Sequence, residues 1–136
     1  MNRAFLLVPV AAVLLGGCGG SPPAEQQHTG TVEVKQQGTP PQRTAWYLRI
    51  EDMEAKPVTE HAYPNAAIAL TQQLSAGDYR VISWNRPCAD TCPSSGENGL
   101  GPLSEVCGAP IKVTEGVRVS ATVVIESEGS CSVRVN

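Results

Sequence analysis

The 136-residue chain has few charged residues, and those that it has are not clustered. Charged side chains make up 17% of the sequence, the ten basic ones are scattered singly, and the net charge is −3. A nucleic-acid surface built from clustered Lys and Arg is therefore not expected. The hydrophobic share of 41% is too high for a disordered chain, and the length leaves room for one small domain.

The sequence also lacks the short motifs of common enzyme classes. It contains no Gly-x-Ser-x-Gly, no His-Glu-x-x-His, no phosphate-binding loop and no paired-carboxylate signature. Of its two histidines, His28 lies in a polar segment and His61 in a proline-flanked one, and neither is paired with a nucleophile by spacing. We therefore expect no enzymatic activity, no catalytic residue and no cofactor.

Only one long hydrophobic run is present, and it lies at the N-terminus. After the single charge of Arg3, residues 4–15 are apolar, a length typical of a secretory signal and shorter than the ~20 residues of a spanning helix. Leu15-Gly16-Gly17-Cys18 resembles the bacterial lipobox, in which a peptidase cleaves before a cysteine that carries a diacylglyceryl thioether. We predict a signal peptide at 1–17 and lipidation of Cys18; the alternative is an ordinary cysteine behind an ordinary signal peptide.

Two acyl chains hold a protein stably on a bilayer. The predicted location is therefore the cell membrane, with the protein lipid-anchored and facing the extracytoplasmic side. Residues 19–30 have no apolar side chain larger than Ala or Pro, so residues 18–30 are predicted to be the lipidated cysteine and a flexible tether. The folded domain is expected at 31–136.

From Thr31 onward the hydrophobic period is two, which is typical of strands with one buried face. No segment has the pattern of a long amphipathic helix. Strands are expected at 31–35, 46–50, 67–70, 79–84, 111–113, 117–125 and 133–135, with one further short strand around Val58. Short strands joined by Gly and Pro turns predict an all-β fold, a small antiparallel β-sandwich, with an open barrel as the alternative.

Residues 74–84 have the sequence Leu-Ser-Ala-Gly-Asp-Tyr-Arg-Val-Ile-Ser-Trp. They look like the Leu-x-x-Gly-x-Tyr-x-Val strand of prealbumin-like and Cna-B-type sandwiches, which include carboxypeptidase-regulatory-like modules. Residues 83–92, with Cys107 and Cys131, resemble a group of actinobacterial secreted lipoproteins that share an Arg-Pro-Cys-x-x-x-Cys loop. The likeness covers about residues 66–136. It implies a prealbumin-like fold, with the glycine in a turn and the tyrosine in the core, and an exported location.

Beyond Cys18 the chain has an even number of cysteines, and in an exported protein this predicts two disulfides. If residues 79–86, 109–114 and 117–125 are successive antiparallel strands, Cys88, Cys107 and Cys131 emerge at one end of the sandwich. This favours Cys88–Cys131 with Cys92–Cys107, and leaves Cys88–Cys107 with Cys92–Cys131 open. A zinc site is a weaker alternative, because only Cys88 and Cys92 are close in sequence.

The segment 93–104 is long, polar and rich in Gly and Pro, and loops held at both ends often carry binding sites. The predicted binding surface consists of four polar residues of this region, Asp90, Glu97, Asn98 and Glu105; the alternative is a tolerated insertion that the disulfides hold against fraying. Acidic side chains there, or the group Glu51, Asp52 and Glu54, could hold calcium, but no calcium-loop spacing is present and we favour solvated acidic surfaces without a metal. Core packing is expected for Trp46 and Trp84, whereas an exposed Trp or Tyr47 would suit stacking on a sugar or gripping a partner.

Together, the lipobox, the strand pattern and the missing catalytic motifs predict a lipid-anchored cell-surface β-sandwich module that binds an envelope protein or glycan. The alternative is a structural or accessory subunit of an envelope complex that has no ligand of its own. A third hypothesis is a small enzyme whose site assembles from scattered residues.

Overall fold

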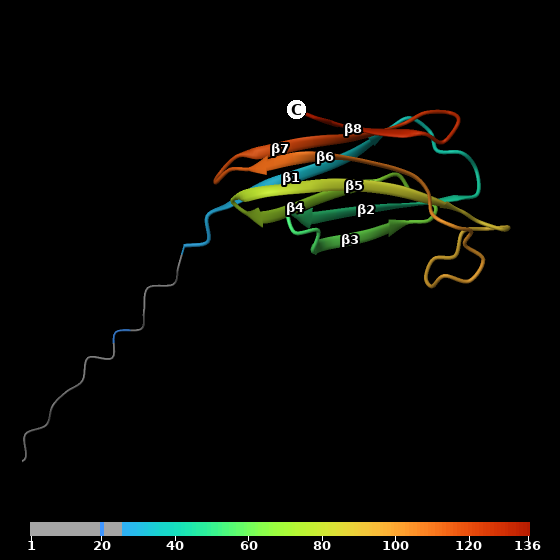
Figure 1. Cartoon of the computed structure of the whole chain (residues 1–136), viewed down its shortest axis with the longest axis horizontal. Coiled ribbons are helices and arrows are strands. Elements are labelled where there is room, and N and C mark those ends of the chain that lie inside the picture. Colours follow the sequence, from blue (N-terminus) through green and yellow to red (C-terminus); the bar gives the residue numbers. More distant parts are fainter. Residues whose placement is uncertain (1–19, 21–25) are drawn as a thin grey trace, which may run out of the picture.

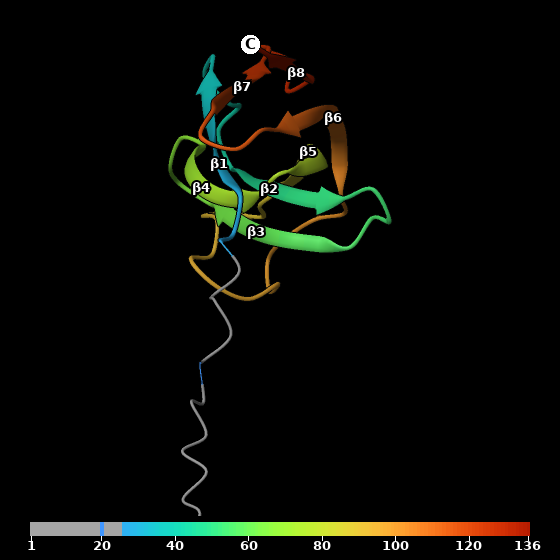
Figure 2. The ribbon, with the colours of Figure 1, turned by 90° about the vertical axis from the view of Figure 1, so that its left-hand side faces the viewer.

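The computed structural model describes residue 20 and residues 26–136. These residues form two four-stranded sheets packed face to face, with strand orders β4-β1-β7-β8 (sheet A) and β3-β2-β5-β6 (sheet B) (Figure 1, Figure 2). The strands are β1 (Thr29–Gln37), β2 (Thr44–Asp52), β3 (Pro57–Tyr63), β4 (Ala69–Ser75), β5 (Gly77–Pro87), β6 (Ser104–Val113), β7 (Arg118–Ile125) and β8 (Cys131–Val135). The predicted all-β fold and small β-sandwich are confirmed.

In the described part of the chain, no helix is long and apolar enough to cross a membrane. The predicted signal peptide and Cys18 lie outside the described residues. The strand β1 begins at Thr29, so two residues of the predicted tether belong to the sandwich.

A strand is present at every predicted place, but the one expected at 67–70 begins only at Ala69, and several are longer than their apolar pattern suggests. At the edge of sheet B, β3 has seven residues where only a short strand around Val58 is expected, because its side chains are mostly exposed and give little hydrophobic alternation. Similarly, β6 begins at Ser104, and its first half is exposed except for the half-buried Cys107. Strands that bury few side chains are hard to detect from periodicity.

One pair of neighbouring strands differs from the predicted antiparallel order. β1 and β7 run parallel, with Val34 opposite Ala121, whereas the other strand pairs are antiparallel. The expectation that 109–114 and 117–125 are adjacent strands is wrong, since β6 and β7 lie in different sheets and the turn between them crosses the sandwich. Alternation shows which side of a strand is buried, and not which strand it pairs with.

The core lies between the two sheets and is built from the alternating inward-facing residues of the long strands. Its largest fully buried apolar side chains all belong to strands except Ile68, which lies in the connection before β4: Trp46, Leu48, Ile50, Ile68, Val32, Val34, Val81, Val113 and Val123. Tyr79 packs against this core, and its hydroxyl donates a hydrogen bond of 2.9 Å to the carbonyl oxygen of Ser75. This contact, a tyrosine corner, fastens the connection through which the chain passes from sheet A to sheet B.

The four cysteines of the sandwich form two disulfides, Cys88–Cys92 and Cys107–Cys131. The prediction of two disulfides is confirmed, but both predicted pairings are wrong: Cys88–Cys131 with Cys92–Cys107, and Cys88–Cys107 with Cys92–Cys131. Because β6 is longer than predicted, Cys107 lies within the strand opposite Ser83 and packs against the core, next to the start of β8. Cys88 lies beyond the end of β5, where its nearest partner is Cys92.

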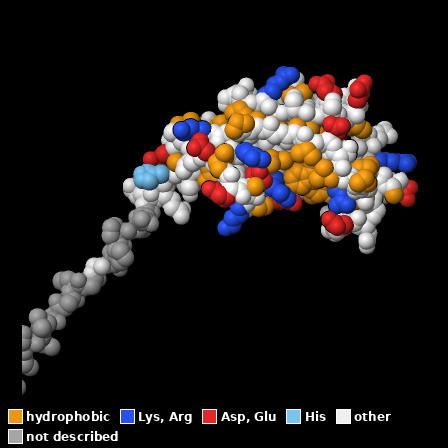
Figure 3. Space-filling model, viewed as in Figure 1, with side chains coloured by type: hydrophobic (Ala, Val, Ile, Leu, Met, Phe, Trp, Pro, Cys, Tyr) orange, Lys and Arg blue, Asp and Glu red, His pale blue; other side chains and the backbone are white. Residues whose placement is uncertain are grey.

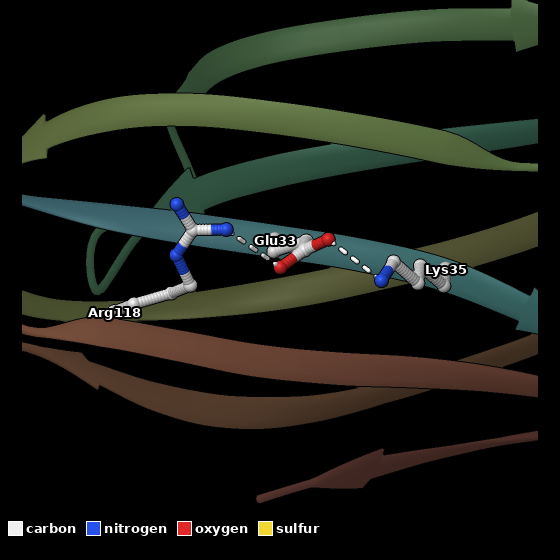
Figure 4. A network of polar contacts seen from close by, with 3 residues as sticks. All are labelled: Glu33, Lys35 and Arg118. Atoms are coloured by element: carbon white, nitrogen blue, oxygen red, sulfur yellow. Dashed lines mark hydrogen bonds and ion pairs between the residues drawn. The ribbon is translucent and has the colours of Figure 1, made fainter.

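The outer face of sheet A is polar. Glu33 on β1 pairs with Lys35 at 2.8 Å and with Arg118 of β7 at 3.1 Å (Figure 4). The hydrogen bonds from Lys35 and then from Arg118 hold the pKa of the Glu33 carboxyl below its ordinary value. A carboxylate with a lowered pKa in the folded state stabilises the fold at pH values above its unfolded pKa, and this contribution is lost as the pH falls through the folded pKa.

We therefore expect Glu33→Gln to destabilise the protein at pH 7 and to destabilise it less at pH 3, because the contribution of the carboxylate decreases as the pH falls from the ordinary glutamate pKa of about 4.3 through the lower folded pKa. Urea unfolding of both proteins at the two pH values measures this difference. Glu126→Gln, at an exposed position, is the control and should change the midpoint little at either pH. An equal effect of Glu33→Gln at both pH values would show that the ion pairs are not its cause.

Candidate functional site

The N-terminal side of β1 and the long loops lie at opposite ends of the sandwich (Figure 1). Near the start of β1, the carbonyl oxygen of His28 accepts a 2.7 Å hydrogen bond from the backbone N–H of Ala76, and that of Thr29 accepts one of 2.9 Å from Gly116. We call this the tether end. The opposite end, which we call the loop end, consists of the connections 38–43, 64–68, 88–103 and 126–130.

The longest loop, 88–103, folds into a compact hairpin. The Cys88–Cys92 disulfide closes its first five residues, Cys88 also forms a β-bridge with Leu100, and Ala89 N–H donates to the carbonyl oxygen of Gly99 at 2.9 Å. The two sulfurs pack with Ala45 into a small second core beside sheet B. The hairpin is thus held by one disulfide and by backbone hydrogen bonds, and not by the two crosslinks that the predicted pairings implied.

The four predicted binding residues are exposed at or next to the loop end: Asp90, Glu97, Asn98 and Glu105. They do not form one cluster. Glu97 pairs with Arg86 at 3.1 Å across the hairpin, whereas Glu105 lines a separate hollow together with Glu128. Among the described residues, no three His, Cys, Asp or Glu side chains gather in a way that could hold a metal ion.

The second acidic group has a structural role. Glu51 is buried and pairs with Arg80 at 3.3 Å. Asp52 ends β2, and its carboxylate accepts hydrogen bonds from the backbone N–H groups of Glu54 and Lys56 at 3.1 and 2.8 Å. These contacts fix the turn between β2 and β3.

The two tryptophans differ in position. Trp46 lies in the core as predicted, whereas Trp84 lies outside the main core, on the outer side of sheet B. Trp84 is stacked on Tyr47 of the neighbouring strand, with ring centroids 5.3 Å apart and planes inclined by 4°, and the Arg49 guanidinium lies 5.1 Å from the Trp84 ring centroid. Trp84 is therefore only 9% exposed, and Tyr47, which is half-buried, is the more solvent-exposed residue of the stacked pair.

The position of Trp84 could not be predicted from the sequence, because Val81 and Ile82 give β5 an apolar residue on both faces.

Hydrophobic side chains gather over β2 and β5 in Figure 3, with Lys, Arg, Asp and Glu side chains around them. Arg49 also pairs with Glu60 at 2.6 Å, so the basic group on this patch is held in place.

A cavity of about 480 Å³ lies at the loop end, between the connections 38–43 and 64–68. Both connections cross from one sheet to the other. The lining side chains are mainly neutral polar groups, prolines and alanines, and they include Gln42, Arg43, Trp46, Tyr63 and Asn65. The sequence analysis missed this site because its residues come from a proline-rich turn and from strand ends that have no recognisable motif.

The disulfide hairpin supports the walls of the cavity. The backbone N–H of Cys88 donates to the carbonyl oxygen of Arg43 at 2.7 Å, and the Asn65 amide donates to that of Cys92 at 3.3 Å. Arg43 has a φ of 58°, in the left-handed region that is uncommon for a residue with a side chain. Such conformations persist only where the surrounding structure enforces them.

Trp46 is 1% exposed and contributes to the cavity wall. Its indole N–H is buried and has no hydrogen-bond partner among the described residues. Leaving a buried donor unpaired costs about 1–3 kcal/mol, so such groups are rare in folded proteins. No other buried side-chain nitrogen or oxygen in the described part of the chain lacks a partner.

A scan against protein-family models, a search of the curated proteins and a search of the solved structures found no match to the chain. The resemblance to prealbumin-like sandwiches and to actinobacterial secreted lipoproteins stays a prediction. We therefore base the function on the sequence and on the geometry of the loop end.

Proposed function

We propose that the protein is a lipid-anchored cell-surface module whose loop end binds an envelope protein or glycan. The observation that carries this proposal is the separation of the tether end from the loop end (Figure 1). A chain anchored through a lipidated Cys18 would have about ten tether residues before β1, with a reach of roughly 17 Å. The tether end then faces the membrane and the loop end faces outward.

The side chains of the loop end and of the adjoining face of sheet B also support binding there. Tyr47 and Trp84, with the Arg49 guanidinium, provide aromatic and arginine groups, which are enriched where proteins bind partners. Sheet A offers a polar outer face on which Glu33 is already paired with two cations. The hairpin is exposed but held, which lowers the entropy lost when a partner orders it.

We expect removal of the hairpin tip to abolish partner capture. Replacing residues 93–98 with two glycines retains the Cys88–Cys92 disulfide, and chemical crosslinking on intact cells should then yield at least about tenfold less partner, as expected when a hot spot is lost. The melting temperature should change little because the strands lie outside the tip. A matched substitution at the tether end, Glu115→Ala, should leave capture unchanged; full capture by the tip variant would contradict the proposal.

A further inference from the structure

We propose that the cavity at the loop end binds the carboxylate of an acidic sugar, so that the ligand is a glycan containing uronic acid residues. This inference rests on the proposed function and specifies its ligand. The cavity volume of about 480 Å³ lies within the range of small-molecule sites, roughly 300–1,000 Å³.

The charge of the cavity favours an anion. Arg43 is the single charged residue among its lining residues. Its guanidinium is exposed and forms no ion pair with any described residue, whereas Arg86 nearby is paired with Glu97. A guanidinium matches the geometry of a carboxylate and binds it through two parallel hydrogen bonds. A single cation balances the single charge of a carboxylate better than the double charge of a phosphate.

The rest of the lining distinguishes a sugar from an acyl chain or an apolar peptide. Side-chain amides of Gln42 and Asn65 and the ring of Tyr63 lie at the cavity, whereas Leu, Ile, Val, Met and Phe are absent from its lining residues. Amides and aromatic rings suit the hydroxyl groups and the apolar faces of a sugar. Apart from the rings of Trp46 and Tyr63, a bulky aliphatic group would find only alanines and prolines to pack against.

The walls of the cavity are prearranged for binding. The Arg43 carbonyl and the Asn65 amide are both hydrogen-bonded to the disulfide hairpin. The backbone position of Arg43 is therefore set before a ligand arrives, which reduces the ordering cost of binding. The hairpin thus supports the walls of the cavity without lining it.

Calorimetric titration of the full-length protein in a mild detergent tests the inference, with digalacturonate and its methyl ester as probes. We expect saturable binding of digalacturonate, at least about tenfold weaker binding of the ester, and an equal loss for Arg43→Gln, because a charge-assisted bidentate contact disappears in each case. Lys56→Gln removes an exposed cation outside the cavity and should bind as the unaltered protein does.

Equal binding of acid and ester, or full binding by Arg43→Gln, would overturn the inference. A tripeptide with a free carboxylate that binds better than digalacturonate would overturn the choice of a sugar. Crosslinks from the loop end to a cell-surface partner without any sugar binding would overturn only this inference, whereas the absence of such crosslinks would contradict the proposed function.

Discussion

Replacing Cys107 and Cys131 together with alanine should lower the free energy of unfolding by about 3 kcal/mol. The disulfide closes a loop with a sequence separation of 24 residues, and restricting the unfolded chain over that length stabilises the fold by roughly 3 kcal/mol. It also joins β6 at the edge of sheet B to β8 at the edge of sheet A, two strands that belong to different sheets. Urea unfolding of the oxidised protein and the double variant measures the difference.

The second disulfide is the matched control. Cys88 and Cys92 are separated by four residues, so their joint replacement should cost less, about 2 kcal/mol in the same chain-entropy treatment. Single substitutions test the pairing itself. Cys107→Ala should free one reactive thiol, at Cys131; a free thiol at Cys92 or Cys88 would contradict the structure.

If Cys18 carries the lipid anchor, as we propose, Cys18→Ala should release the protein from the membrane. The given sequence contains no apolar run of the about 20 residues that a spanning helix needs. Each buried methylene of an acyl chain contributes ~0.8 kcal/mol, so the loss of two chains removes nearly all of the membrane affinity. We expect an unlipidated species, uncleaved or soluble, in fractionated cells.

Mass spectrometry of the N-terminal peptide provides the second measurement for this variant. The unaltered protein should begin at Cys18 and carry the mass of a diacylglyceryl group. Ser21→Ala, three residues away, should keep both the acyl mass and the membrane fraction. Unchanged fractionation of Cys18→Ala and a mature peptide without acyl mass would contradict the lipid anchor.

The strands of the sandwich could be predicted because their signal is local. Val32 and Val34 alternate with polar neighbours on β1, and Val119, Ala121 and Val123 do so on β7, so each strand shows its buried side in its own sequence. The Leu74-x-x-Gly77-x-Tyr79 pattern has the expected local result only in part: Tyr79 packs against the core but is partly buried, and Gly77 is the first residue of β5, not a turn residue.

Features that depend on contacts between distant segments could not be predicted in the same way. The parallel pairing of β1 with β7 joins residues more than eighty positions apart, as Val34 with Ala121. The pairing of Cys107 with Cys131 depends on the unforeseen length of β6. The cavity combines Arg43 and Asn65 from two connections, and neither segment carries a motif that indicates a site.

Photo-crosslinking on intact cells tests most directly whether the loop end is the binding surface. A photoreactive residue is placed either at Asn98, in the exposed hairpin tip, or at Thr114, in the exposed turn of the tether end. The proposed function predicts a discrete adduct with an envelope protein or glycan from Asn98 and none with that partner from Thr114. Adducts with the partner from Thr114, together with none from Asn98, would contradict it.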